Sequence, residues 1–442
     1  MQELKNIKFD PGFKKGVVAV PSSKSIAHRA LICAALAKEQ SYIYRIDRSD
    51  DIDATINAMQ TMGEHIEILE DKMTVVGADI ARPPEDLDLD GLNGRAMRAL
   101  TDNNIIINCK ESGSTLRFLI PVAAALGLNA TFIGEGSLLP RTIRLYEDLF
   151  KDKNVDLKLN NGRVPATVSG KLSAGKFHIP GNITSQFITG LLFALPLLDG
   201  NSEIILTSKL ESAPYVDLTV DVLKIFGIVI HKTSNGYYIN GNQHYLSATF
   251  IVEGDFSQAA FFAAAAAIHG DITIKRLAFR SLQGDYKIID ILNEFGAKIF
   301  FEGNVLRAVK GENLKGIKID ATQIPDLIPV LSVVAAYAHG ETVIYNAERL
   351  RLKESDRIHA IYKMLTAIGA NVQETSGGLI IGGTGGEKLP GGFVNSFNDH
   401  RIAMSAAVAS INTINGVVVD DMSCINKSYP MFLRDFMGLD GK

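Results

Sequence analysis

One pattern recurs six times along this 442-residue chain: a polar or charged start followed by an Ala-rich apolar segment of helical length. The copies read, in order, "PSSKSIAHRALICAALA" from Pro21, "SGSTLRFLIPVAAAL" from Ser112, "ITSQFITGLLFALPLL" from Ile183, "DFSQAAFFAAAAAI" from Asp255, "IPDLIPVLSVVAAYA" from Ile324 and "NDHRIAMSAAVASI" from Asn398. After a longer first gap they are about 70 residues apart. A helix that is apolar on all sides has to be buried. The pattern therefore predicts six buried helices with polar N-termini.

A second kind of helix lies between these copies. It is amphipathic and ends in a glycine, at Gly63, Gly227, Gly296 and Gly369, which suits a left-handed helix cap. Short β-rich runs such as "GVVAV", "SEIILT" and "FHIP" accompany the helices. A single unit of this kind cannot bury its own core. We therefore expect two globular α/β domains of three units each, with chain crossings near "PSSK" and "SATFIVEGD".

The composition excludes several classes of protein. A net charge of −4 gives no general attraction to nucleic acid or to anionic lipid. The longest apolar run, Ala259 to Ile268, is shorter than the roughly 18 residues that span a bilayer, and residues 1–20 contain no signal-like apolar core. The three cysteines, Cys33, Cys109 and Cys424, form no CxxC pair, which argues against a disulfide framework or a zinc site. We expect a soluble protein of the cytoplasm.

The N-terminus of a buried helix is a natural seat for phosphate or carboxylate, because its N–H groups are unpaired and its dipole is positive there. Candidate site residues, all polar except one glycine, lie at these helix N-termini or in short polar motifs elsewhere. They are Lys24, Ser25, Arg29, Ser112, Gly113, Ser114, Arg117, Arg141, Thr184, Ser185, Gln186, Asp326, Lys353, Arg357, Asp399, His400, Arg401 and Lys427. Taken singly, each is better explained as a helix cap or a solvated surface residue. An arginine in the first turns of an apolar helix, as at positions 29, 117 and 401, instead needs an anionic partner. Together they predict a site for a small polyanion.

Two carboxylates, Asp326 in "QIPDLIP" and Glu354 in "RLKESDR", lie among polar or cationic residues. Paired carboxylates can divide the roles of acid and base between them. His28 and His400 each adjoin an arginine, and either a catalytic role or orientation by local hydrogen bonds would explain them. The chain contains no GxxxxGK[ST] loop and no HExxH motif.

With these motifs the chain resembles the 5-enolpyruvylshikimate-3-phosphate synthase family of enolpyruvyl transferases. The resemblance runs in family order through "PSSKSIAHRA", "SGSTLR", "GEGSLLPR", "GNITSQF", "SAPYVDLT", "EGDFSQAAFF", "IPD", "LKESDR", "NDHRIAM" and "CINKSYP". It implies an α/β (α+β) fold of two domains, each with three βαβαββ repeats whose buried helices point at an interdomain cleft. The implied domains are residues 1–21 with 252–442, and residues 22–251.

The resemblance also implies a reaction in chorismate and aromatic amino acid biosynthesis. The enolpyruvyl group of phosphoenolpyruvate would pass to the 5-hydroxyl of shikimate 3-phosphate by addition and elimination of phosphate. Neither a metal nor a cofactor is implied, no nucleic acid or membrane partner is expected, and the family expectation is a monomer. C3 of phosphoenolpyruvate must gain a proton and the hydroxyl must lose one, while several anionic groups are held away from water.

Carried over by motif, the resemblance implies a role for each site residue. Shikimate 3-phosphate would be held by Lys24, Ser25, Arg29, Thr184, Ser185, Gln186, Ser212, Asp326 and Lys353, and phosphoenolpyruvate by Lys24, Gly113, Arg141, Gln186, Arg357, Arg401 and Lys427. Asp326 would take the hydroxyl proton, Glu354 would deliver a proton to C3, and Lys24 would support charge in both steps. A glycine at position 113 would also let a ligand approach the backbone closely.

One departure and two alternatives accompany this interpretation. Glu111 stands where many members of the family have Asn, and we expect its carboxylate to pair with a site arginine rather than repel an anionic ligand. A related enolpyruvyl transferase acts on UDP-N-acetylglucosamine, but its reactive cysteine has no convincing counterpart here. A non-catalytic polyanion-binding module is the other alternative, and the net acidity and the Asp326 and Glu354 pair weigh against it.

Overall fold

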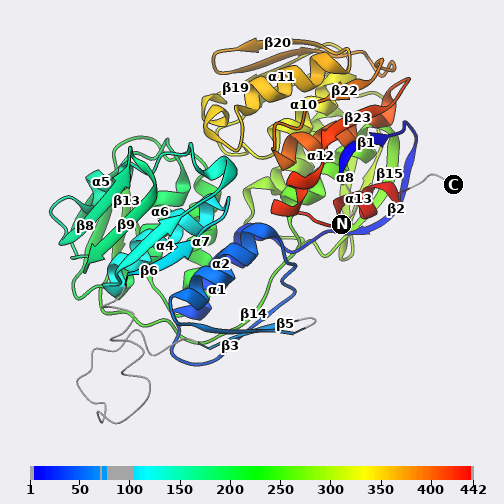
Figure 1. The fold of residues 1–442 in the computed structure, drawn as a ribbon. Coiled ribbons are helices and arrows are strands. Elements are labelled where there is room, and N and C mark those ends of the chain that lie inside the picture. The colour runs from blue at the N-terminus through cyan, green and yellow to red at the C-terminus, as the bar shows by residue number, and fades with distance from the viewer. Residues whose placement is uncertain (1–3, 70–71, 77–103, 440–442) are drawn as a thin grey trace. The chain divides into compact units, whose positions relative to one another are not determined.

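The chain divides into two compact units in a computed structural model that describes residues 4–69, 72–76 and 104–439 (Figure 1). The terminal unit comprises Met1–Ser23 with Glu253–Lys442, and the central unit comprises Lys24–Val252. Each unit is a mixed α/β structure around its own hydrophobic core. The fold class that the sequence predicts is therefore confirmed.

The six buried helices occur where the repeated pattern predicts them. They are α1 (Lys24–Ala35), α4 (Gly113–Leu126) and α6 (Ser185–Ala194) in the central unit, and α8 (Phe256–His269), α10 (Ile328–Tyr337) and α12 (His400–Ala409) in the terminal unit. Several begin at a capping side chain, because an orphan N–H of the first turn needs an acceptor. Ser112 accepts from the N–H of Thr115, and Asp399 accepts from the N–H of Arg401. These caps hold the polar motifs at the helix starts.

The described residues form six sheets that share one topology, a parallel pair of strands extended by antiparallel neighbours. The central unit contains β14 (Thr249–Ile251)-β3 (Ser41–Tyr44)-β5 (Lys72–Val76)-β4 (His65–Ile68), β6 (Ile105–Asn108)-β7 (Ala130–Ile133)-β9 (Arg163–Gly170)-β8 (Val155–Asn160), and β10 (Lys176–Ile179)-β11 (Ser202–Leu206)-β13 (Gly236–Ile239)-β12 (Ile230–Thr233). The terminal unit contains β16 (Lys298–Glu302)-β17 (Val305–Val309)-β15 (Gly270–Lys275)-β2 (Lys14–Ala19), β18 (Lys318–Asp320)-β19 (Glu341–Tyr345)-β21 (Gly378–Gly382)-β20 (Asn371–Thr375), and the three-stranded β1 (Lys5–Phe9)-β23 (Val417–Asp421)-β22 (Gly392–Val394). The repeat is therefore a unit of tertiary structure as well as of sequence.

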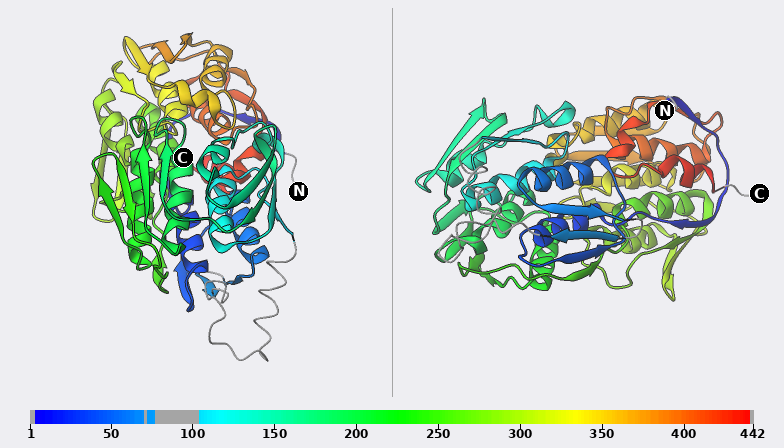
Figure 2. Two further views of the ribbon diagram at one scale, coloured as in Figure 1. Left: turned by 90° about the vertical axis from the view of Figure 1, so that its left-hand side faces the viewer. Right: turned by 60° about the horizontal axis from the view of Figure 1, so that its bottom comes forward.

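Strands from distant parts of the chain complete three of these sheets. In the terminal unit, β1 pairs with β23 and β2 pairs with β15, so the blue N-terminal strands lie beside later segments of the same unit (Figure 2). In the central unit, β14 pairs with β3. Each unit is thus closed by pairing between its first and last segments.

The amphipathic helices are α2 (Asp50–Thr61), α7 (Ala213–Ile225), α9 (Ile288–Phe295) and α11 (Arg357–Ala367), with the short helices α5 (Leu145–Phe150) and α13 (Phe432–Met437) besides. The glycines predicted to follow the four longer ones all have positive φ, at 106° for Gly63, 80° for Gly227, 107° for Gly296 and 86° for Gly369. A side chain is rarely accommodated in this left-handed conformation. The predicted helix ends are confirmed.

Candidate active site

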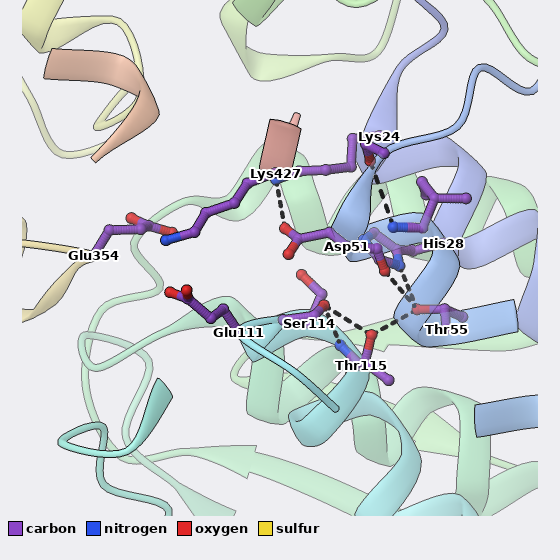
Figure 3. A network of polar contacts seen from close by, with 12 residues as sticks. Lys24, His28, Asp51, Thr55, Glu111, Ser114, Thr115, Glu354 and Lys427 are labelled. Carbon is purple, nitrogen blue, oxygen red and sulfur yellow. Dashed lines mark hydrogen bonds and ion pairs between the residues drawn. The ribbon is translucent and has the colours of Figure 1, made fainter. Parts of the chain in front are cut away.

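Lys24 begins α1, and its ammonium is held by a carboxylate of the neighbouring helix. Its Nζ lies 2.7 Å from Oδ2 of Asp51, with side-chain exposures of 19% and 15% (Figure 3). Asp51 lies in the first turn of α2. Acidic residues are common in the first turn of a helix because the helix dipole favours them there. The sequence alone therefore does not indicate Asp51 as a partner of Lys24.

Arg29 is buried in a cage of neutral oxygen atoms. Its Nε donates to Oγ1 of Thr219 at 2.8 Å, and Nη2 donates to the carbonyl oxygen of Tyr215 at 2.9 Å. Nη1 donates to the carbonyl oxygen of Ser25 at 2.6 Å. Burial lowers the pKa of Arg29 to about 10, which still leaves the side chain charged at neutral pH. No carboxylate of the described residues pairs with Arg29, so an anionic ligand can supply the missing charge.

Two arginines converge over Gly113 at the start of α4. A Cβ atom at this position would lie 2.8 Å from Nη1 of Arg117 and 2.9 Å from Nη1 of Arg141. Nη1 of Arg117 also donates to Oε1 of Gln186 at 2.7 Å, and Nε2 of Gln186 donates to Oγ of Ser114 at 3.0 Å. A side chain at position 113 would therefore have to displace the two guanidinium groups. The cluster brings together three residues predicted for phosphoenolpyruvate and adds Arg117.

The remaining predicted residues of the central unit lie at helix starts. Thr184 caps α6 by accepting a hydrogen bond from the N–H of Gln186 at 3.3 Å, and Ser185 is the first residue of that helix. Ser212 precedes α7 with a φ of 53°, a left-handed conformation that is uncommon for a residue other than glycine. A strained backbone at a buried polar residue is typical of functional sites.

In the terminal unit, the guanidinium of Arg357 holds three carboxylates. Arg357 begins α11 and is only 1% exposed. Nη1 donates to Oδ1 of Asp326 at 2.7 Å, and Nη2 donates to Oε2 of Glu354 at 2.6 Å. Nε donates to Oδ2 of Asp399 at 2.8 Å. The two carboxylates predicted for acid and base chemistry are thus held by one planar group.

Three further predicted cations lie around the same carboxylates. Nζ of Lys353 and Nε of Arg401 each lie 3.5 Å from Oδ1 of Asp326. Nη1 of Arg401 also donates to the carbonyl oxygen of Asp326 at 3.2 Å. Lys427, at the end of the short 3-10 helix η7 (Ser423–Lys427), donates to the carbonyl oxygen of Asn398 at 3.3 Å. All the sequence-predicted site residues of this unit therefore occupy one cluster around the N-termini of α10, α11 and α12.

The charges of this cluster set its protonation states. Burial alone would raise the pKa of Asp326, but Arg401, Lys353 and Arg357 outweigh burial and hold it well below its ordinary value. Burial would likewise lower the pKa of Arg357, but Asp399, Glu354 and Asp326 outweigh it. Burial lowers the pKa of Lys353, although the nearby Asp326 opposes the shift. Asp326 is therefore ionised and able to accept hydrogen bonds or a proton.

Asp285 is a buried carboxylate that the sequence did not indicate. It lies in the 3-10 helix η4 (Gly284–Lys287), where it accepts a hydrogen bond from Oγ of Ser257. Burial, with the charge of Asp326 added, raises its pKa to about 6, although Arg401 and Ser257 oppose the shift. Its motif "LQGDYK" resembles an ordinary turn before an amphipathic helix, so only tertiary structure identifies it.

Glu111 is bound to the turn that leads to Arg141. Its Oε2 accepts from the N–H of Ser137 at 3.0 Å and from Oγ of Ser137 at 2.6 Å, at the 3-10 helix η2 (Gly136–Leu138). A Cβ at Gly136 would lie 2.5 Å from this carboxyl group. The predicted pairing of Glu111 with a site arginine stays a prediction.

The cysteines are poor nucleophiles in this structure. All three are free and buried. Burial raises the pKa of Cys33 and of Cys109, and it raises that of Cys424 to about 12. Because the thiolate is the nucleophile, none resembles an activated cysteine.

No group of three or more His, Cys, Asp or Glu side chains among the described residues is arranged to hold a metal ion. None of the helices within the described ranges is both long and apolar enough to cross a membrane.

Comparisons with known proteins agree with one another. The sequence model of the EPSP synthase (3-phosphoshikimate 1-carboxyvinyltransferase) family matches residues 11–436. The 3-phosphoshikimate 1-carboxyvinyltransferases of Clostridium novyi and Clostridioides difficile are each 44% identical to the chain over 439 residues, covering 99% of it and 98% of the relative.

A solved structure is similar along the whole length of the chain. The EPSP synthase of Acinetobacter baumannii matches with a TM-score of 0.81 and 24% identity, covering 99% of this chain and 98% of that one. At this identity the similarity establishes the fold. The sequence matches establish the family: the chain belongs to the EPSP synthases.

Proposed function

We propose that the chain transfers the enolpyruvyl group of phosphoenolpyruvate to the 5-hydroxyl of shikimate 3-phosphate and releases phosphate. The single observation that carries this proposal is the binding of both Asp326 and Glu354 to Arg357, at 2.7 and 2.6 Å. The reaction removes a proton from a hydroxyl and adds one to a carbon. Two carboxylates held together by a buried cation are suited to these two transfers.

Arg29 supports the assignment of the phosphorylated acceptor. A buried guanidinium without a carboxylate partner favours an anion, and shikimate 3-phosphate carries both a carboxylate and a phosphate. We assign Ser25, Thr184, Ser185 and Ser212 to the same ligand, since their hydroxyls lie at helix starts where they can orient it.

The arginine pair over Gly113 supports the assignment of phosphoenolpyruvate. Two guanidinium groups within about 3 Å of one point match the oxygens of a phosphate or carboxylate. Arg357 and Arg401 would contribute further charge, and to do so Arg357 must exchange at least one of its carboxylate partners for the ligand.

In the proposed addition step, the acceptor hydroxyl oxygen bonds to C2 of phosphoenolpyruvate while Asp326 takes its proton and protonated Glu354 gives a proton to C3. The product is a tetrahedral adduct with a methyl group. In elimination, phosphate leaves from C2 with the proton that Asp326 had taken, and the methyl group returns a proton to Glu354, which restores the double bond and both carboxyl groups. Fixed cations stabilise the charge that develops in both steps.

The low pKa of Asp326 also fits a carboxylate that acts as a base only after the ligands have bound. Three cations hold its pKa low in the ligand-free chain, and this weakens it as a base. An anionic ligand that engages Arg357 and Arg401 competes for those same cations. Binding of phosphoenolpyruvate would therefore raise the basicity of Asp326 at the moment it is needed.

We also propose that the chain is a cytoplasmic monomer. The three free, buried cysteines support a reducing compartment, where disulfides are rare. Light scattering of the purified protein would test the oligomeric state.

Phosphate release tests the proposed function. The purified protein is mixed with phosphoenolpyruvate and either shikimate 3-phosphate or UDP-N-acetylglucosamine. Release is expected with shikimate 3-phosphate alone. Release with the nucleotide sugar would point to the other enolpyruvyl transferase, and absence of release with both acceptors would leave only a binding module.

A further inference from the structure

The helices α1 and α2 of the central unit are joined by two polar pairs, one partly buried and one fully buried. Lys24 bonds to Asp51 at 2.7 Å, and Nδ1 of His28 lies 2.7 Å from Oγ1 of Thr55. On each helix the second residue lies one turn after the first, so the pairs form two successive rungs between helices that run in the same direction (Figure 3). The second rung is fully buried, with His28 at 1% and Thr55 at 0% exposure.

Thr55 extends this link to a third helix. Its Oγ1 lies 2.7 Å from Oγ1 of Thr115 on α4. Oγ1 of Thr115 donates to Oγ of Ser112 at 2.7 Å, and the N–H of Thr115 donates to the same atom at 3.2 Å. Ser112 is the N-cap of α4 and directly precedes Gly113. A continuous buried chain thus runs from α1 through α2 to the phosphoenolpyruvate-binding end of α4.

The chain has a single hydrogen-bond direction. A hydroxyl carries one hydrogen, and that of Thr115 is directed at Ser112. Oγ1 of Thr55 also lies 3.5 Å from the carbonyl oxygen of Asp51, but Thr115 at 2.7 Å is the much closer acceptor for its hydrogen. With that hydrogen on the side of Thr115, Nδ1 of His28 must donate to Thr55. The imidazole therefore carries a hydrogen on Nδ1, and the lack of an acceptor for the buried Nε2 among the described residues favours the neutral form. Burial and the neighbouring Lys24 and Arg29 hold the pKa of His28 well below its ordinary value, which agrees with a neutral ring.

The other ring nitrogen of His28, Nε2, is buried and makes no competing hydrogen bond among the described residues. Arg29, the next residue, turns instead to Thr219 and Thr189 on other helices. Two adjacent side chains of α1 therefore make separate sets of hydrogen bonds, and of these hydrogen bonds only those that begin at His28 lead to α4; Arg29 contacts α4 through the ring of Phe118, 5.3 Å from its guanidinium carbon.

We propose that Thr55 is a positioning residue that fixes the N-terminus of α4, with Gly113, relative to Lys24 on α1. The inference rests on the proposed function, because Gly113 and Lys24 are both assigned to phosphoenolpyruvate. Thr55 touches no ligand itself. It acts through Thr115 and Ser112 on the backbone that the ligand approaches. A buried hydroxyl at the junction of three helices can do this because losing it leaves Nδ1 of His28 without a partner and breaks the bond that links α2 to Thr115.

Replacement of Thr55 by an isosteric residue tests the contribution of its hydroxyl group alone. Thr55→Val removes the bonds to His28 and Thr115, and the weaker one to the carbonyl oxygen of Asp51, with almost no change in shape. Displacement of a positioned group by about 1 Å is expected to raise the KM for phosphoenolpyruvate about tenfold or more. The KM for shikimate 3-phosphate should change much less, because the Arg29 cluster is not touched. Thr55→Ser keeps the hydroxyl and should restore the wild-type KM.

Thr413→Val is the matched control for loss of a buried threonine hydroxyl. Oγ1 of Thr413 donates to the carbonyl oxygen of Ser410 and accepts from the N–H of Gly416, in the terminal unit and outside the site clusters. This variant should be less stable but keep both KM values. Equal changes of both KM values in Thr55→Val, or no change in either, would overturn the proposal.

Nitrogen NMR of His28 in the wild-type protein tests the chain without any enzyme assay. The ¹⁵N shifts at neutral pH should show a neutral imidazole protonated on Nδ1. Protonation on Nε2 would overturn the proposal even if Thr55→Val failed to fold. If the wild-type protein released no phosphate, the proposed function would be refuted. The NMR result would still show whether the hydrogen bonds run from His28 through Thr55 to Thr115.

Discussion

The ammonium of Lys24 and the carboxylate of Asp51 form an ion pair of 2.7 Å between the first turns of α1 and α2. Both side chains are more than four-fifths buried, at 19% and 15% exposure. The pair is therefore shielded from water, and it fixes the orientation of a side chain assigned to both ligands.

Asp51→Asn should lower kcat/KM by about tenfold to a hundredfold, because Lys24 loses the partner that orients it. Steady-state kinetics would measure this effect. Asp53→Asn is a control on the same helix, since Asp53 pairs with the more exposed Arg48. Equal activity of the two variants would show that Asp51 does not orient Lys24.

Arg29→Lys should weaken binding of shikimate 3-phosphate by about tenfold or more, since an ammonium cannot reproduce the planar fork of the guanidinium. Four neutral acceptors around Arg29 fix that fork in place. Isothermal titration calorimetry would measure the affinity. Unchanged affinity would remove Arg29 from the acceptor site.

Glu111→Ala should raise the KM for phosphoenolpyruvate, because it frees the turn at Ser137 that leads to Arg141. Both bonds from Ser137 reach one oxygen, so Glu111→Gln can keep them while it removes the charge. An unchanged phosphoenolpyruvate affinity and pH profile in Glu111→Gln would refute the expected pairing with an arginine. A loss in this variant similar to that in Glu111→Ala would support the pairing.

Asp285 should make stability depend on pH. Its folded-state pKa of about 6 lies above the ordinary value of an aspartate, so the folded chain binds the proton more tightly than the unfolded chain does. The stability due to this proton is complete below about pH 4 and is lost as pH rises to about 6.

Asp285→Asn removes this ionisation and can still accept the bond from Ser257. The variant should gain stability over wild type as pH rises from 4 to 8, by about 2 to 3 kcal/mol. Urea unfolding at the two pH values would measure the gain, with the exposed Asp290→Asn as control. A difference between variant and wild type that does not change with pH would contradict the raised pKa.

The sequence predicts the six buried helices, their caps and the glycine ends because these depend on local composition and backbone conformation. Arg357 could be predicted as a site residue from "LKESDR", but its three carboxylate partners could not, since Asp326 and Asp399 come from other repeats. Asp51, Thr55 and Asp285 were missed for a related reason. Each looks like an ordinary residue of a helix start or an amphipathic helix, and only packing against another element reveals its role.

Turnover by a Glu354→Gln variant tests the central claim most directly. Phosphate release from phosphoenolpyruvate and shikimate 3-phosphate is compared among wild type, Glu354→Gln and the exposed control Glu387→Gln, while calorimetry measures binding of both ligands. We predict that Glu354→Gln binds both ligands but releases no phosphate, and that Glu387→Gln behaves as wild type. Turnover by Glu354→Gln at the wild-type rate would contradict the account.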